Sequence, residues 1–198
     1  MSITLFRSEG GELVLPNRDL NLVPREDGGN LIVNPARAVW DRSELTPSEL
    51  IQWSFLTAAA ARAMLDTLPQ LAGGCVNYWD AGNWALNEQA QPHGPKSGPE
   101  HRRVHLHLLG RSRTAKDPSW RWGEAPTFPD FTDRFAWAAK YDRLTPEECE
   151  RIVVKCRSSL ASKYGTTADG TTRCESCRYP FAEGLHALCD ECRNSRPR

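Results

Sequence analysis

The sequence has no net charge and no long run of apolar residues. It carries 25 basic and 25 acidic residues, so a general electrostatic attraction to nucleic acid or to an anionic membrane is absent, and any anion site must be local. The apolar stretches are far too short to cross a bilayer, and the first residues lack the apolar core of a signal peptide. We therefore expect a cytoplasmic protein with no membrane partner.

A framework of disulfides is not indicated either. The chain has seven cysteines, an odd number, and no secretion signal. Four of them form two Cys-x-x-Cys pairs, Cys174 with Cys177 and Cys189 with Cys192, and 11 residues separate the pairs. Two tight turns at this spacing can present four thiolates to one tetrahedral Zn²⁺. Because a segment of about 30 residues cannot build an adequate core, we predict that 173–198 is a zinc ribbon with structural Zn²⁺.

Two helices are predicted by similar starting motifs. The segments 46–49 (Thr-Pro-Ser-Glu) and 145–148 (Thr-Pro-Glu-Glu) each combine an N-cap threonine, a proline at the first helical position and a glutamate at the third. Apolar residues at roughly helical spacing follow each motif, so we expect helices over 46–68 and 145–165.

Short strands are expected around the first helix, where glycine and proline mark the turns. They are 3–6, 12–15, 20–23, 31–33, 75–79 and 84–86. With the two main helices they predict an α+β domain over 1–165 that has a single antiparallel sheet. A polar linker, 166–172, follows and offers no apolar group for docking. We therefore expect the ribbon to be structurally separate from the chemistry, and truncation after Tyr164 to leave a folded domain.

Residues 101–111 (His-Arg-Arg-Val-His-Leu-His-Leu-Leu-Gly-Arg) are predicted to form a strand with a polar front and an apolar back. Alternate side chains share a face of a strand, so His101, Arg103, His105 and His107 would project to one side. Two imidazoles about 7 Å apart can contact one phosphate group from two points. Between residues 100 and 124 there are six basic and three acidic residues, in a chain that is neutral overall. The strand is therefore a candidate anion site, and a metal site is disfavoured because no third ligand stands at an obvious spacing.

This strand, together with the Leu86-Asn87-Glu88 segment and the glycine-containing loop before it, resembles the core of the histidine-triad nucleotide hydrolases and transferases. The family pattern is His-φ-His-φ-His-φ-φ, where φ is apolar. Residues 29–35 and 45–50 resemble the family's strand-then-helix lead-in, so the resemblance extends over residues 20–111. It implies a histidine-triad-like fold and chemistry at an α-phosphate that needs no catalytic metal.

The resemblance implies a role for each matching residue. His105 would be the nucleophile that forms a covalent nucleotidyl-imidazole, His107 would hydrogen-bond the phosphoryl oxygens, and Asn87 would help to orient the site. Arg103 stands where the family has its first histidine, and it could hold phosphate through its fork of N–H donors. Asn30 stands where a second histidine is usual.

Further substrate contacts are expected from residues around the strand. They are Asn30, Gly98, His101, Arg111 and Trp122. The tryptophan-rich segment after the strand is expected to pack on the sheet, and a role in stacking on a base is the alternative.

We expect a nucleotidyl hydrolase or transferase that acts on a dinucleoside polyphosphate, a nucleoside phosphoramidate or a similar nucleotide substrate. One alternative is aprataxin-like removal of adenylate from nucleic-acid ends, because a histidine-triad domain followed by a zinc module is the architecture of those enzymes. Five basic and five acidic residues over 165–198 do not favour nucleic acid as the partner. The other alternative is a catalytically inactive nucleotide- or protein-binding module, which the loss of the first triad histidine would fit. A homodimer is compatible with each.

Overall fold

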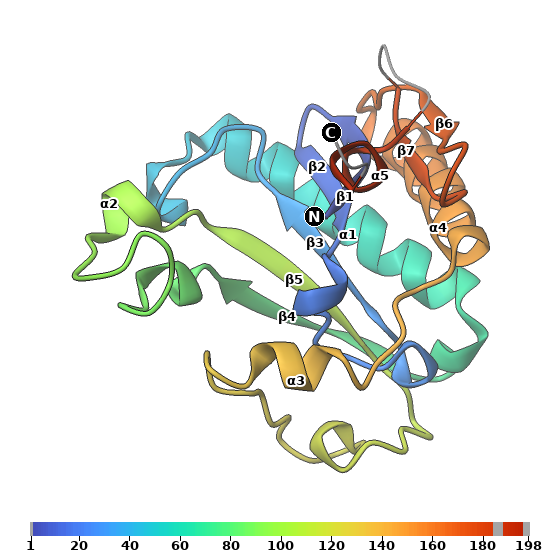
Figure 1. Ribbon diagram of the computed structural model, residues 1–198. Helices are drawn as coiled ribbons and strands as arrows, with labels where there is room; N and C mark the ends of the chain where they lie inside the picture. The colour runs from blue at the N-terminus through green and yellow to red at the C-terminus, as the bar shows by residue number, and fades with distance from the viewer. Residues whose placement is uncertain (1, 184–187, 196–198) are drawn as a thin grey trace.

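The computed structural model describes residues 2–183 and 188–195 and has an α+β architecture. Five strands form one antiparallel sheet in the order β1-β2-β3-β5-β4. They are β1 (Ile3–Ser8), β2 (Gly11–Leu15), β3 (Asn30–Asn34), β4 (Cys75–Ala81) and β5 (His105–Arg111). Figure 1 shows β5 running between β3 and β4, with β4 at the edge of the sheet. The predicted α+β class with an antiparallel sheet is confirmed.

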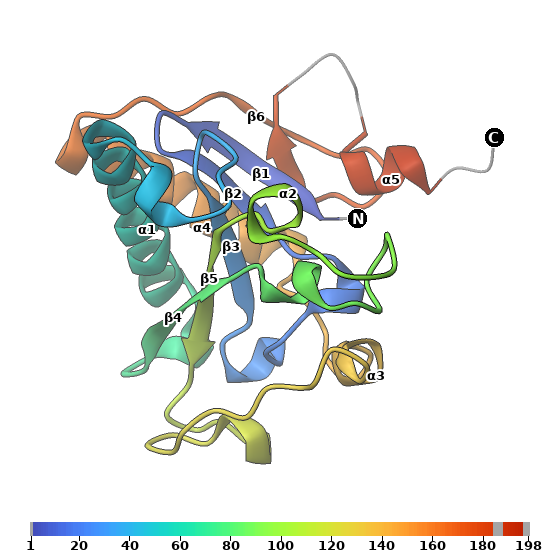
Figure 2. The same cartoon turned by 90° about the vertical axis from the view of Figure 1, so that its left-hand side faces the viewer.

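Two long helices cover one side of this sheet. The helices of the described residues are α1 (Pro47–Thr67), α2 (Gly98–His101), α3 (Arg134–Ala138), α4 (Pro146–Ser159) and α5 (Asp190–Asn194). Helices α1 and α4 pack against each other and against the sheet, while α3 lies on the opposite side, as Figure 2 shows. No helix in 2–183 or 188–195 is both long and apolar enough to span a bilayer.

Both predicted helices begin as the sequence indicated. In each, the threonine hydroxyl accepts a hydrogen bond from the glutamate N–H, and the glutamate carboxylate accepts one from the threonine N–H. These reciprocal bonds satisfy backbone donors that have no partner inside the helix. Helix α4 continues through a π-helical turn, Leu160–Tyr164, and ends at Gly165, whose φ of 65° is left-handed.

Three of the predicted strand segments differ in the structure. Residues 20–23 are not a strand. A 3-10 turn, Arg18–Leu20, comes first, and the Leu22 N–H then donates to the side chain of Asn30 and not to a neighbouring strand. Residues 84–86 lie in a 3-10 turn, Asn83–Leu86, which follows Gly82 at a φ of 122°. The histidine strand begins at His105, because residues 98–101 form the short helix α2 instead.

The two faces of β5 are as different as its alternating sequence indicated. Leu106 and Leu108 are buried in the main core between the sheet and the two long helices. On the other face, Leu109 packs in a second apolar cluster with Leu22, Val23 and Trp120. His105 and His107 share this second face. The fold therefore presents both histidines on the side of the sheet that is not covered by the long helices.

The C-terminal segment packs on the sheet, although the linker sequence predicted no apolar group for docking. In the linker, Ala168 pairs with Ser8 at the edge of β1 and packs against the main core. The strands β6 (Thr171–Arg173) and β7 (Pro180–Ala182) form an antiparallel pair, and Tyr179 and Phe181 belong to the same core as the sheet. The physical reason is that β1 is an edge strand, whose apolar residues the C-terminal segment covers.

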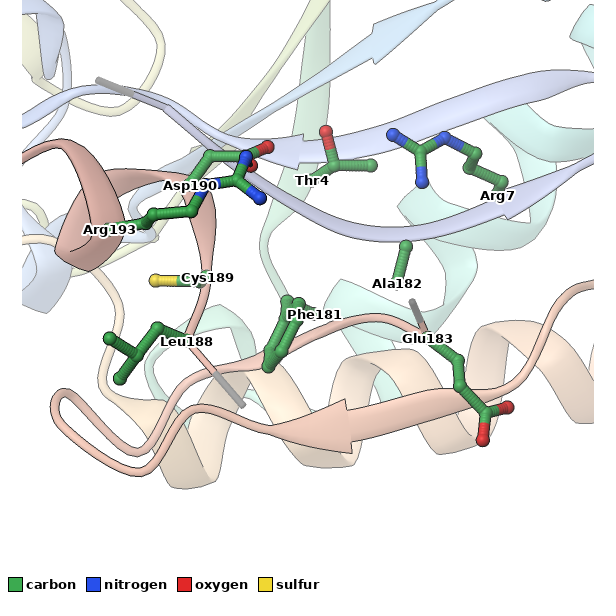
Figure 3. A pocket seen from close by; sticks show the side chains of 9 residues that line it. All are labelled: Thr4, Arg7, Phe181, Ala182, Glu183, Leu188, Cys189, Asp190 and Arg193. Atoms are coloured by element: carbon green, nitrogen blue, oxygen red, sulfur yellow. Dashed lines mark hydrogen bonds and ion pairs between the residues drawn. The ribbon is translucent and has the colours of Figure 1, made fainter. Parts of the chain in front are cut away.

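Polar contacts fix the same packing. The Tyr179 hydroxyl donates to the carbonyl oxygen of Leu144 at 2.7 Å. The guanidinium of Arg143 is almost fully buried and lies 2.9 Å from the carboxylate of Glu191 on α5. Figure 3 shows Phe181 and Ala182 of β7 beside β1, around a small pocket of about 160 Å³.

Candidate active site

A cavity of about 460 Å³ lies in front of β5. Its walls are mainly apolar and come from β3, β4, β5 and the turns that flank them. The lining residues are Leu20, Leu22, Ile32, Trp79, Ala81, Gly82, Asn83, Trp84, Ala85, His101, Arg103, His105 and His107. The structure thus brings His101, Arg103, His105 and His107 to one cavity, although His101 belongs to α2 and not to the strand.

His105 is held as a neutral imidazole with one defined tautomer. Its Nδ1 lies 3.0 Å from the carbonyl oxygen of Arg103. A carbonyl only accepts, so Nδ1 must carry the proton, and the lone pair then lies on Nε2. Burial lowers the pKa of His105 below its ordinary value, against the opposing effect of this hydrogen bond. An imidazole that is neutral and has a free Nε2 lone pair is a competent nucleophile at neutral pH.

His107 lies deeper than His105 and is only 6 % exposed. Its ring centroid is 5.0 Å from that of His105 and 5.3 Å from that of Trp79, which stacks on Phe128 at 4.5 Å. Burial lowers the pKa of His107 to about 3, and repulsion from His105, when that ring is protonated, adds to the effect. His107 can therefore donate one hydrogen bond as a neutral ring, and it supplies no positive charge near neutral pH.

Arg103 is the cation of the cavity. Its Nη1 donates to the carbonyl oxygens of Pro99 at 3.0 Å and of Arg102 at 2.6 Å. Among the described residues, its Nε and Nη2 have no hydrogen-bonding partner, so these donors are available to an anion. His101 is anchored in a similar way to His105, with Nδ1 3.3 Å from the carbonyl oxygen of Ser97.

Asn87 and Gly98 do not line the cavity. The side-chain oxygen of Asn87 accepts from the Gln89 N–H at 2.9 Å, and the backbone carbonyl oxygen of Asn87 accepts from Lys96 Nζ at 2.8 Å. Gly98 begins α2, where a Cβ atom would lie 3.2 Å from the ring of Trp40. Both residues shape the loop before the site, and neither lies among the side chains that face the histidines.

Arg111 and Trp122 also lie outside the cavity. The buried Arg111 guanidinium donates to the carbonyl oxygens of Arg121 and Glu124 and lies over the ring of Trp120. Trp122 is 40 % exposed. Arg111 therefore holds the loop after β5 in place. The tryptophan-rich segment packs on the sheet through Trp120, whose Nε1 donates to the carbonyl oxygen of Gly110 at 2.7 Å.

Several cavity residues were not among the sequence candidates. Trp79 pairs with His107 across β4 and β5, and Trp84 and Asn83 come from the turn that follows β4. The signal that could have identified Trp79 is its place on a strand next to the histidine strand, since opposite residues of paired strands share a face. Trp84 could not be placed in this way, because its segment is a turn and has no strand register.

Asn30 lies on β3, two residues before the cavity residue Ile32, and is 1 % exposed. Its Oδ1 accepts from the Leu22 N–H at 3.1 Å, whereas its Nδ2 is buried and has no hydrogen-bonding partner among residues 2–183 and 188–195. The same holds for Nδ1 of His107 within these residues. Buried polar atoms of this kind are uncommon in folded proteins, and both of these belong to predicted site residues.

The four predicted cysteine ligands come together in the C-terminal segment. Their Sγ atoms all lie within 4.8 Å of one another, which is compatible with a metal ion bound among Cys174, Cys177, Cys189 and Cys192. Burial disfavours the Cys174 thiolate, but hydrogen bonds from the backbone N–H groups of Cys177, Cys189 and Ser176 outweigh it and lower the pKa of Cys174 to about 6. This cluster is far from β5 in the fold, at the β1 side of the sheet.

The arrangement in front of β5 can carry out nucleophilic substitution at an electrophile that bears anionic oxygens. His105 offers a lone pair, His107 a neutral donor and Arg103 a fixed positive charge. Comparisons of the chain with protein-family models, with curated proteins and with solved structures give no match.

Proposed function

We propose that the protein is a nucleotidyl hydrolase or transferase that acts at an α-phosphorus through a covalent nucleotidyl-His105 intermediate. The observation that carries this proposal is the hydrogen bond from Nδ1 of His105 to the Arg103 carbonyl oxygen, within a cavity that also holds His107 and Arg103. The bond fixes the ring so that the nucleophilic Nε2 is the unprotonated atom. The resemblance of the sequence to the histidine-triad family supports the same assignment.

The reaction has two displacement steps. In the first, the Nε2 lone pair of His105 forms an N–P bond, and the P–O or P–N bond to the leaving group breaks. The leaving group departs with the electron pair of that bond and takes a proton from water. In the second step, water or an acceptor hydroxyl attacks phosphorus, the N–P electron pair returns to Nε2, and the attacking oxygen gives its proton to the hydroxide that the first step left in solvent. Dividing one difficult displacement into two lowers each barrier.

The other side chains stabilise charge and bind the substrate. Arg103 meets the negative charge of the phosphate with a rigid set of N–H donors. His107 donates to a phosphoryl oxygen as a neutral ring. Trp79 and Trp84 provide flat apolar surface in the same cavity, which suits the base of a nucleotide.

The test is detection of the covalent intermediate. The protein is incubated with α-labelled dinucleoside polyphosphate, nucleoside phosphoramidate and adenylated DNA, then quenched and assayed for a base-stable, acid-labile adduct. We expect an adduct that His105→Ala abolishes, with His93→Ala as the matched control because His93 lies in an exposed loop. An adduct from adenylated DNA alone would select the removal of adenylate from DNA ends. Absence of any adduct, with nucleotide binding retained, would favour an inactive binding module.

We also propose that the metal held by the four cysteines is Zn²⁺. Four thiolates in a closed, tetrahedral arrangement are a common structural zinc site, whereas an iron site with the same ligands would be coloured and redox-active. Metal analysis of the purified protein should give one zinc per chain, and substitution with Co²⁺ should give the absorption of a tetrahedral tetrathiolate complex. Iron in place of zinc would contradict the assignment.

A further inference from the structure

Two buried atoms that have no hydrogen-bonding partner in the described part of the chain lie on neighbouring strands, on the face of the sheet that carries the cavity. They are Nδ2 of Asn30 and Nδ1 of His107. Strands β3 and β5 are antiparallel neighbours, with Ile32 opposite His107 and Asn30 opposite Leu109. Asn30 is therefore the diagonal neighbour of His107, and because Ile32 lines the cavity, the two side chains share its face.

The oxygen of the Asn30 side-chain amide fixes the orientation of that amide. Oδ1 accepts the backbone N–H of Leu22 at 3.1 Å, so the atom on the remaining side of the amide is Nδ2, a donor. His107 is neutral near pH 7, since burial lowers its pKa to about 3. One ring nitrogen of a neutral imidazole donates and the other accepts, so an unpartnered Nδ1 can accept what Nδ2 offers.

Diagonal neighbours on antiparallel strands have Cβ atoms somewhat less than about 7–8 Å apart, which is within reach of two side chains of this length. Each atom has lost its contact with water without gaining a protein partner, and such atoms are costly to leave unpaired. A hydrogen bond between the two would satisfy both at once, and no other described residue offers either atom a hydrogen bond.

We infer that Asn30 is a positioning residue, whose Nδ2–H donates to Nδ1 of His107 and fixes the Nε2–H tautomer of that ring. The only N–H of His107 then points away from Asn30 and toward the cavity, where it can meet a phosphoryl oxygen. This last step rests on the proposed function, whereas the tautomer itself does not. Asn30 would thus act through His107 and would make no contact with the substrate.

The test is the tautomer of His107, read from its ¹⁵N shifts in the free protein. We expect Nε2 protonated and Nδ1 unprotonated in the wild type. In Asn30→Asp, a carboxylate of the same shape replaces the donor by an acceptor, so the proton should move to Nδ1 and the pKa of His107 should rise. Asn30→Ala, which removes the donor without adding charge, should leave both tautomers populated. Asn77→Asp is the matched control, because Asn77 lies on the neighbouring strand β4, opposite Leu109, and outside the cavity.

Activity gives an independent readout. If adduct formation occurs, Asn30→Asp should slow it by about 10²–10³-fold, the cost of losing one donor to the phosphoryl oxygens, with little change in KM. The control should stay within a few-fold of the wild type. A wild-type His107 that is protonated on Nδ1, or a tautomer that Asn30→Asp leaves unchanged, would overturn the inference even if the adduct forms. Absence of the adduct with the expected tautomer change would overturn the proposed function alone.

Discussion

Removal of the Phe181 ring should destabilise the whole chain and not the C-terminal segment alone. Phe181 lies on β7, is 8 % exposed, and belongs to the same apolar core as Ile3 and Leu5 of β1. The neighbouring Tyr179 is tied to Leu144 by a hydrogen bond in the same region. A cavity at Phe181 would therefore weaken the packing between the C-terminal segment and the sheet.

The expected size of the effect follows from this burial. Replacing a buried phenylalanine by alanine removes the transfer energy of the ring and leaves a cavity, with a total cost of about 3–5 kcal/mol. Because Phe181 retains some exposure at the margin of the core, the lower value of about 3 kcal/mol applies. For a chain of this size, each kcal/mol lowers Tm by about 2–4 °C, so the expected shift is about 6–12 °C.

The seven tryptophans allow a direct assay, because all of them lie between residues 40 and 137. Their emission reports on the sheet and the cavity, whereas release of zinc to a chromogenic chelator reports on the cysteine cluster. We expect thermal unfolding followed by tryptophan emission to show the full shift in Phe181→Ala. Phe135→Ala is the matched control, since Phe135 is 53 % exposed on α3 and its removal should change stability by no more than about 0.5 kcal/mol.

A tryptophan transition that is unchanged in Phe181→Ala, together with faster release of zinc, would refute this reasoning. That result would mean that the C-terminal segment unfolds as a separate unit, as the composition of the linker had indicated. Chelation of zinc should lower the same tryptophan transition, because metal-binding energy in such a segment is folding energy. Truncation after Tyr164 should likewise give an unstable chain, since it would uncover the apolar residues of β1.

Four further predictions concern the cavity. Arg103→Lys should slow adduct formation by about tenfold or more, because an ammonium cannot reproduce the guanidinium fork, and an equal rate would show that only charge matters there. The pKa of His107 is about 3 in the folded state and about 6.5 in the unfolded state, so the unfolded state binds more protons between these two pH values. The free energy of unfolding should therefore fall by about 1.4 kcal/mol for each pH unit as the pH drops through that window. His107→Gln should remove this pH dependence when acid denaturation is measured. The rate of adduct formation should begin to fall only below the ordinary histidine pKa of about 6.5, because burial lowers the pKa of His105, and a rate that falls already above pH 6.5 would contradict this. Phe128→Ala should remove the stack that supports Trp79 beside His107, and should both weaken nucleotide binding and slow the reaction by about 10–10²-fold.

The sequence by itself determined the features that depend on neighbouring residues. Both long helices start at their capping boxes because the threonine and the glutamate that close each box are three residues apart. The alternation along β5 directs Leu106 and Leu108 to the core and His107 to the other face, whichever strands flank it. The spacing of Cys174 and Cys177, repeated in the second pair, likewise defines two turns that can each present two thiols.

Only the tertiary structure decided which of the candidate residues meet. His101 and Arg103 precede β5 rather than lying on it, and they reach the cavity because α2 and the turn after it fold back over the sheet. Arg111 lies on the same face of the strand as the histidines, but the loop after β5 closes over it and its guanidinium binds two carbonyl oxygens of that loop. No spacing along the chain encodes such contacts, because they depend on how loops return to the sheet.

The position of the C-terminal segment has the same physical origin. Its composition is polar in the linker and rich in cysteine beyond it, which is typical of an independent small unit. The structure nevertheless buries Tyr179 and Phe181, and partly buries Ala168, in the core that β1 and the helices form, because an edge strand with an apolar side must be covered by some part of the chain. Which part covers it is a matter of long-range packing, and a few apolar residues in a polar segment are enough to decide it.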